Sequence, residues 1–157
     1  MPWYKREGKE LPIYLKDTKT IALAHSKEID FNEQSSFLTW FTGFTDAEGN
    51  FLINLDRGYI RFRFKISMHI DNLEALNTIK SILKIGSVTV DKDKRYCSFV
   101  VQKFSDFRDV ICPIFVQFPL LTCKSLDFQD FYKAVLIKNK NHLSHADKNR
   151  IIMLKTV

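Results

Sequence analysis

The stretch Phe41-Thr42-Gly43-Phe44-Thr45-Asp46-Ala47-Glu48-Gly49 decides how the rest of the chain is interpreted. It continues a helical pattern that Ser35 or Ser36 can cap, and the helix must end near Gly49, where a strand begins. An acid at the end of a helix faces the negative end of the helix dipole, which is unfavourable unless a positive charge lies there. Glu48 is therefore a candidate ligand of a cation.

The same helix also carries a row of small side chains. Its apolar residues cover much of its circumference, which predicts a helix that is buried on more than one side. Thr39, Gly43 and Ala47 follow one another at spacings of four, and such a row lets a second helix come unusually close. We therefore predict a helix–helix interface along these three residues.

Two half-exposed strands are predicted directly after the motif. Residues 50–56 alternate between apolar and polar, and residues 59–68 repeat the pattern more cleanly. On the second strand, Arg61, Arg63 and Lys65 lie in a row on the face opposite the apolar side chains. Because like charges in a row repel, we interpret this face as a surface that lies against phosphates rather than as ordinary solvated surface.

A second helix and two further strands complete the sheet. Asp71 and Glu74 form a capping-box-like start for that helix. The first of the two strands would direct Val88 and Val90 to the core. The predicted sheet then has four strands, with one apolar face and one polar, basic face.

From residue 105 onward the pattern is helical, and the last short helix is predicted to be capped by Ser144 with Asp147 three residues later. We expect these helices to pack on the apolar face. The order of elements predicts an α+β sandwich whose second sheet face is left for a ligand.

Composition indicates one basic domain. The chain has 157 residues, of which 45% are hydrophobic, and this suits a single core. Its net charge of +6 lies outside residues 1–36, where acidic and basic side chains balance. We divide the chain into an N-terminal extension, residues 1–36, and a domain, residues 37–157. A basic domain of this kind most often contacts a polyanion.

Other features limit the cellular setting. The apolar runs are too short for a membrane span, and the N-terminus lacks the pattern of a signal or transit peptide, so we expect a soluble compartment and no membrane partner. Cys97, Cys112 and Cys123 have neither pairing nor metal-ligand spacing, and we interpret all three as reduced core thiols.

The chain resembles the LAGLIDADG homing endonucleases and their maturase relatives, most closely the N-terminal halves of fungal organellar two-motif enzymes. The resemblance extends from Phe37 to Lys155 and rests on the nonapeptide and on residues 64–69, 118–124 and 139–143. It implies an αββαββα sandwich with a four-stranded antiparallel saddle sheet. It also implies a mitochondrial protein, with the chloroplast as the alternative.

The resemblance implies a site as well. Glu48 matches the family's catalytic acid, and the Ala47 carbonyl would join it on Mg²⁺. Lys124 matches the basic catalytic position near the scissile phosphate. We interpret Asp46 as a structural acid that fixes the end of the motif helix, and His69 as a surface or turn histidine. By position, the nucleic-acid contacts would come from Asn50, Leu52, Asn54, Arg61, Arg63, Lys65, Ser67, Thr89, Tyr96 and Ser98.

Three functions are open at this point. The first is a Mg²⁺-dependent, site-specific endonuclease that acts on double-stranded DNA. Because the chain contains one motif, cutting both strands requires a homodimer through the motif helices or pairing with a second LAGLIDADG half. The second is an RNA-binding intron maturase, and the third is a non-catalytic part of an organellar ribonucleoprotein such as the mitochondrial ribosome. The intact Glu48 favours the endonuclease, because a pure RNA binder has no need of an acid beside phosphates.

Overall fold

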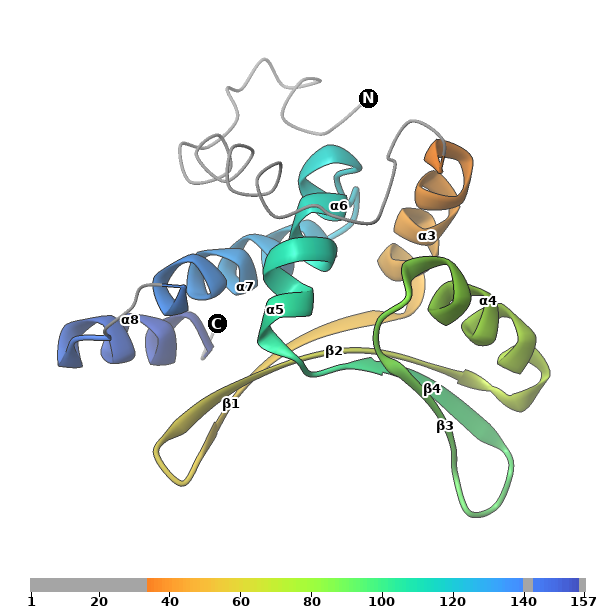
Figure 1. The fold of residues 1–157 in the computed structure, drawn as a ribbon, viewed down its shortest axis with the longest axis horizontal. Coiled ribbons are helices and arrows are strands. Elements are labelled where there is room, and N and C mark those ends of the chain that lie inside the picture. The colour runs from red at the N-terminus through yellow and green to blue at the C-terminus, as the bar shows by residue number, and fades with distance from the viewer. Residues whose placement is uncertain (1–33, 140–142, 156–157) are drawn as a thin grey trace.

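The computed structural model describes residues 34–139 and 143–155 (Figure 1). The predicted extension, residues 1–36, lies almost entirely outside the described residues, and so do residues 140–142 of one family-like segment. The elements run α3 (Ser35–Glu48), β1 (Gly49–Asp56), β2 (Tyr59–His69), α4 (Leu73–Leu83), β3 (Ser87–Val90), β4 (Tyr96–Val101), α5 (Phe104–Asp106), α6 (Cys112–Gln117), α7 (Lys124–Lys138) and α8 (His145–Lys155).

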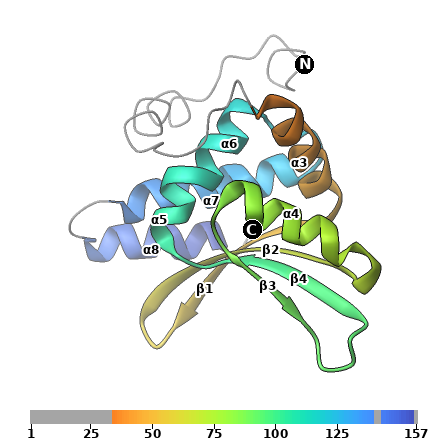
Figure 2. The same cartoon turned by 45° about the vertical axis from the view of Figure 1, so that its right-hand side comes forward.

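The four strands form one antiparallel sheet in the order β1-β2-β4-β3. Figures 1 and 2 show the helices gathered on one side of this curved sheet, while its other side stays open. The predicted α+β architecture with a four-stranded saddle sheet is confirmed.

A two-residue turn joins β1 and β2 into a hairpin. Asp56 pairs with Tyr59, and the two residues between them, Arg57 and Gly58, both have positive φ, at 50° and 82°. This is the backbone of a type I′ turn, whose twist matches that of the strands it joins. The turn sets the register of every pair between the two strands.

The core lies between the sheet and the helices, and it is rich in phenylalanine. The alternation predicted for β2 is confirmed, since Phe62, Phe64 and Ile66 are buried. Phe64 contacts the rings of both Phe41 from α3 and Phe115 from α6, so the motif helix is anchored on the second strand. Aromatic pairs of this kind add about 0.5–1.5 kcal/mol each beyond the area that they bury.

One inward residue of the sheet was predicted wrongly. Val88 packs against the core, but Val90 keeps 44% of its surface exposed. The reason is that β3 is a four-residue edge strand whose last pair, Val90 with Cys97, lies at the rim of the sheet. Alternation places a side chain on a face, but it does not say whether a helix covers that part of the face.

Helix starts were predicted less well than strands. No side-chain cap is present at α3, where Gln34 precedes the first helical residue Ser35, so the proposed serine cap is wrong. The capping box proposed for Asp71 and Glu74 is also wrong, because Asn72 precedes α4 without a side-chain cap. The cap at α8 is confirmed by a reciprocal pair of hydrogen bonds: Ser144 N donates to the Asp147 carboxylate, and Asp147 N donates to Ser144 Oγ.

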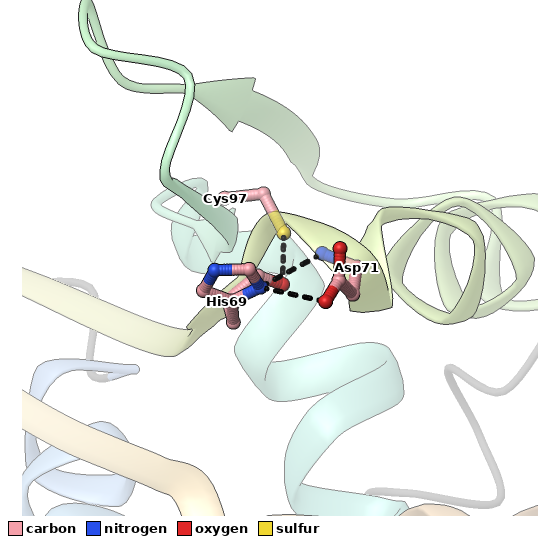
Figure 3. A network of polar contacts seen from close by, with 3 residues as sticks. All are labelled: His69, Asp71 and Cys97. Atoms are coloured by element: carbon pink, nitrogen blue, oxygen red, sulfur yellow. Dashed lines mark hydrogen bonds and ion pairs between the residues drawn. The ribbon is translucent and has the colours of Figure 1, made fainter.

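The turn from β2 into α4 is instead organised by His69 (Figure 3). The imidazole Nδ1 accepts a hydrogen bond from Asp71 N at 3.3 Å, and the Asp71 carboxylate lies 3.2 Å from the same nitrogen. The Cys97 thiol donates to the His69 carbonyl at 3.5 Å. His69 is thus a turn histidine, as expected, and its contacts join the end of β2 to a short 3₁₀-helix at Ile70–Asn72.

A wider helical turn connects α5 and α6. Residues Phe107–Ile111 form a π-helical segment, and Pro113 follows within the first turn of α6. In a regular α-helix, the proline ring would collide with the carbonyl four residues earlier, that of Asp109. The wider turn relieves this collision, so the helical direction continues past the proline.

The cysteines follow the prediction in part. All three are free, and Cys97 and Cys112 are buried, with burial raising the pKa of both thiols. Cys123, however, is exposed at the start of α7, so its assignment to the core was wrong. Among the described residues, no helix is long and apolar enough to cross a membrane.

Candidate active site and nucleic-acid interface

The motif helix runs into the first strand without any connecting loop. A Cβ atom on Gly49 would lie 2.6 Å from the Thr45 methyl group and 2.8 Å from the Thr45 carbonyl oxygen. Only glycine therefore lets the chain turn this sharply from α3 into β1. The turn leaves Glu48 exposed at the last helical position, where within the described residues its carboxylate has no hydrogen bond or ion pair.

Unlike Glu48, Asp46 has a carboxylate that accepts hydrogen bonds from the segment that precedes α7. It accepts hydrogen bonds from Leu121 N at 2.9 Å, from Thr122 N at 3.0 Å and from Thr122 Oγ1 at 2.7 Å. Thr42 adds a second link, since its hydroxyl donates to the Phe118 carbonyl at 3.3 Å. Asp46 is thus a structural acid, and it joins the motif helix to residues 118–123.

Lys124 closes a ring of contacts around Glu48. The Thr122 hydroxyl, which donates to Asp46, also accepts a hydrogen bond from Lys124 N at 3.2 Å. The Lys124 ammonium group then donates to the carbonyl oxygen of Gly49, the residue that follows Glu48. The chain from Asp46 to Gly49 completes the ring, so the lysine is fixed to the residue that follows the exposed acid.

The donor atoms at this point suit half of a metal site. The Glu48 carboxylate and the Ala47 carbonyl are exposed oxygen donors of the kind that Mg²⁺ prefers. Asp46 already accepts hydrogen bonds from three donors, and the described residues contain no group of three His, Cys, Asp or Glu that could hold a metal ion. A complete coordination shell would therefore need ligands from outside the described residues.

The predicted nucleic-acid contacts share the open face of the sheet. The register of β1 and β2 places Asn50 beside Lys65, Leu52 beside Arg63 and Asn54 beside Arg61. The register of the other pairs places Ser67 and Thr89 beside Ser98 and places Tyr96 beside His69. Directly paired residues point to the same face, so these side chains form one continuous polar surface, which we call the saddle face.

The saddle face is basic, and a hydrogen bond holds two of its side chains together. Within residues 34–139 and 143–155, its three strand cations make one ion pair, between Arg61 and Asp56 at 3.3 Å, and both of these side chains are well exposed. An exposed pair of this kind contributes little to stability and leaves the arginine free to exchange partners. The Ser67 and Ser98 hydroxyls share a hydrogen bond at 3.0 Å.

The small residues of α3 form an uncovered strip. Thr39, Gly43 and Ala47 are exposed, and a Cβ atom on Gly43 would have no neighbour within 4 Å. Beside them, Trp40 keeps 44% of its surface exposed while it stacks on Phe44. A large aromatic ring in water next to a row of small residues is typical of an interface, since exposed apolar area of this kind is unfavourable.

Two residues that matter at the site were missed in the sequence. Thr122 links Asp46 to Lys124, and a threonine two residues before a helix start is a signal that could have indicated this role. Lys138, at the end of α7, reaches the carbonyl of Ile60 on β2 at 2.6 Å. Lys138 lies on a helix that packs on the apolar face of the sheet. The sequence therefore gave no indication that its ammonium group lies near the strand cations.

The comparisons with known proteins agree with this geometry. A profile of the family described as LAGLIDADG endonuclease matches residues 41–135, which begins inside α3 and ends in α7. The chain therefore belongs to the LAGLIDADG endonuclease family.

Individual relatives give the same result. The chain is 32% identical over 117 residues to a probable intron-encoded endonuclease 2 of Neurospora crassa, covering 74% of this chain and 26% of that protein. It is 31% identical over 126 residues to an uncharacterized mitochondrial protein, RF1, of Saccharomyces cerevisiae, covering 80% and 26%. The chain thus spans about a quarter of the length of these curated relatives.

A solved structure extends the likeness to three dimensions. The LAGLIDADG meganuclease I-AabMI bound to uncleaved DNA has a TM-score of 0.68 and 30% sequence identity, covering 75% of this chain and 43% of that one. The family resemblance expected from the sequence is confirmed.

Proposed function

We propose that this chain is one half of a site-specific DNA endonuclease that hydrolyses phosphodiester bonds with Mg²⁺. The observation that carries the proposal is the division between the two motif acids. The Asp46 carboxylate accepts hydrogen bonds from three donors, whereas Glu48 is exposed and the Lys124 ammonium group is bonded to the carbonyl of the residue after it. Family membership and the DNA-bound meganuclease relative support duplex DNA as the substrate.

The saddle face would lie in the major groove of the duplex. Each base pair shows a distinct pattern of donors and acceptors there, and amide and hydroxyl side chains such as Asn50, Asn54 and Ser98 can contact base edges. Arg61, Arg63 and Lys65 would contact phosphates and fix the register of the protein on the duplex. The open, curved side of the sheet in Figure 1 is free to accept such a ligand.

The chemistry would take place at the end of α3. The Glu48 carboxylate and the Ala47 carbonyl would hold Mg²⁺, which supplies a Lewis acid and an activated water when bound. Lys124, already fixed beside Glu48, would offset the negative charge that develops on the phosphate. Because one chain supplies one such acid, cleavage of both strands would require two copies paired through α3, or pairing with a second LAGLIDADG half.

We place the protein in the mitochondrion. This is supported by the mitochondrial relative of Saccharomyces cerevisiae and by the intron-encoded relative of Neurospora crassa, both from fungi. These relatives give no support to the chloroplast.

Cleavage by the native chain and by Glu48→Gln tests the proposal. The substrate is a duplex that contains the uninterrupted insertion site. It is made by joining the two genomic sequences that flank the element carrying the coding sequence. The native chain should cut it with Mg²⁺ and stop when the metal is chelated, while Glu48→Gln should bind with unchanged affinity and not cut. Glu74→Gln, which alters an exposed acid on α4, should cut like the native chain.

Two results would contradict the proposed endonuclease activity. The first is binding of duplex DNA by the native chain with no cleavage in Mg²⁺ or Mn²⁺. The second is tighter binding to the folded intron RNA than to the duplex, which would favour the maturase or the ribonucleoprotein component.

A further inference from the structure

Part of strand β2 has one edge without a neighbouring strand, and a side chain from the helical layer contacts this edge. Pairing between β2 and β4 begins at Phe64 with Val101, so residues 59–63 of β2 are paired with β1 alone. On the open side, the Lys138 ammonium group at the end of α7 donates to the Ile60 carbonyl at 2.6 Å. Side chains from both faces of the sheet can therefore meet around this edge.

Four cations gather there. A pocket of about 260 Å³ is lined by Arg61, Arg63 and Lys138, together with the amides of Asn54 and Gln102. A second pocket of about 480 Å³ shares Arg61 and Lys138 with the first and adds Lys148 from α8. Among the described residues, no carboxylate lines either pocket. We call Arg61, Arg63, Lys138 and Lys148 the edge cluster.

Among the described residues, one ion pair involves the edge cluster, that between Arg61 and Asp56 at 3.3 Å. Lys138 makes no ion pair within the described part of the chain, and its ammonium group lies 5.4 Å from the ring centres of Phe62 and Phe104. Burial lowers the pKa of Lys138, and the nearby charge of Arg61 lowers it further. Arg63 Nε is buried without a hydrogen-bond partner. A buried N–H donor without an acceptor is unfavourable, and Arg63 is also one of the residues that line the first pocket.

We propose that the edge cluster binds a phosphate group of the DNA backbone, outside the saddle face. Guanidinium and ammonium groups that converge on one pocket suit a phosphate, and the two amides can donate to its remaining oxygens. Arg61 and Arg63 belong to both surfaces, so the backbone of a duplex on the saddle face would continue into the pocket. The proposal rests on the proposed function and adds Lys138 and Lys148 from the helical layer to the contact surface.

The salt dependence of duplex binding tests this assignment. Fluorescence anisotropy with a labelled duplex is measured for the native chain, Lys148→Gln and Lys138→Met over a range of salt concentrations. Each phosphate contact that is lost should lower the slope of log affinity against log salt by about one unit, for specific and nonspecific duplexes alike. Lys80→Gln removes an exposed charge from α4 and should leave the slope unchanged.

Two controls keep the result interpretable. Lys148 is exposed, so Lys148→Gln tests the cluster even where Lys138→Met disturbs the packing on the phenylalanines. In a second arm, inorganic pyrophosphate is titrated while the Arg Nε–H signals are followed by NMR, which needs no DNA. The Arg63 signal should shift in the native chain and shift less in Lys138→Met.

The outcomes separate this proposal from the proposed function. Failure of the native chain to bind duplex DNA, with the Arg63 signal still shifting, would reject the function and keep an anion site. Slopes equal to the native value in both variants, or an Arg63 signal that pyrophosphate leaves unchanged, would reject the edge cluster as a phosphate site.

Discussion

Asp46 and Glu48 are separated by one residue, but their side chains lie in different surroundings. Asp46 points to residues 121 and 122 and accepts hydrogen bonds from two backbone N–H groups and one hydroxyl. Glu48 lies at the exposed end of the same helix, and the Lys124 ammonium group is bonded to the residue after it. The first acid therefore joins α3 to residues 121 and 122, and the second is the one that the proposed function assigns to the metal.

Replacing Asp46 with asparagine tests its structural role. Asparagine keeps the size but turns an NH₂ group toward N–H donors, so at least one of the hydrogen bonds must be lost. Because hydrogen bonds to a charged acceptor contribute about 1.5–3 kcal/mol each, we expect a loss of about 2 kcal/mol in the free energy of unfolding. Cleavage should fall with it, since residues 118–123 lead into Lys124.

Urea denaturation and cleavage rates measure both effects. Asp93→Asn, in the exposed turn between β3 and β4, serves as the matched control and should leave both unchanged. A stable, fully active Asp46→Asn protein would show that the contacts to Leu121 and Thr122 are dispensable.

Two threonines of the motif should respond oppositely to the same substitution. Thr45 is fully buried and its hydroxyl has no partner, so Thr45→Val should stabilise the fold by about 1 kcal/mol. The Thr42 hydroxyl donates to the Leu38 and Phe118 carbonyls, so Thr42→Val should destabilise it by about 1 kcal/mol. Valine has the same shape in both cases, so urea midpoints that move in the same direction would refute this account.

The sequence indicated the positions of Glu48 and of the strand cations better than it indicated which residues hold the site together. Glu48 and the row of strand cations follow from local spacing, because helix ends and strand alternation are properties of neighbouring residues. The partners of Asp46 lie 75 and 76 residues away, and no local pattern records such a contact. Lys138 was missed for the same reason, since its bond to Ile60 spans 78 residues.

At the scale of elements, the junction of α3 and β1 sets the geometry of the site. The motif contains two glycines that differ in their surroundings. A Cβ atom on Gly49 would collide with Thr45, whereas one on Gly43 would meet nothing. One glycine is needed for the turn into the strand, and the other leaves an open strip on the helix.

Alanine substitution at the two glycines should therefore have opposite effects. Gly43→Ala should raise the free energy of unfolding of the isolated chain by about 1 kcal/mol, because glycine inside a helix is unfavourable by that amount. Gly49→Ala should lower it by about 1–3 kcal/mol, since the new methyl group must displace a backbone carbonyl. Thermal or urea unfolding of the two variants checks the signs, and a stable Gly49→Ala protein would contradict the collision.

Elements with long periodic patterns were predicted correctly, whereas the single-residue cap signals failed at two of the three helix starts where they were proposed and held at α8. Strand β2 has one unbroken alternation, and burial follows it from Ile60 to Ile66. The caps proposed at Ser35 and Asp71 failed because a cap depends on the backbone angles of one residue, which neighbouring contacts decide. His69 instead supplies the acceptor at the start of the 3₁₀-helix, and no helix-cap preference indicates histidine there.

At the scale of the molecule, the proposed function assigns the saddle face to the DNA and the exposed strip of α3 to a partner. The sheet leaves one face open (Figures 1 and 2). Within the described part of the chain, Thr39, Gly43 and Ala47 of α3 are exposed. Under the proposed function, one motif supplies one Glu48, so cutting both strands would require a second motif. We propose the strip as the surface where that second motif would pack.

A bulky residue at Gly43 should separate pairing from folding. Gly43→Gln is expected to fold at least as stably as the native chain, because glutamine is a good helix former and the position has free space around it. The same side chain would hold a partner helix away from the strip. Sedimentation on a short duplex should therefore show two native copies per duplex but one copy of Gly43→Gln, which should nick rather than cut both strands.

Ser81→Gln, on the exposed side of α4, adds the same bulk elsewhere and should behave like the native chain. Two copies of Gly43→Gln on the duplex, with both strands cut, would place the interface away from α3. A native chain that remains single on the duplex until a second motif-bearing chain is added would favour the paired half over the homodimer, because the strip would then be built for a helix unlike its own.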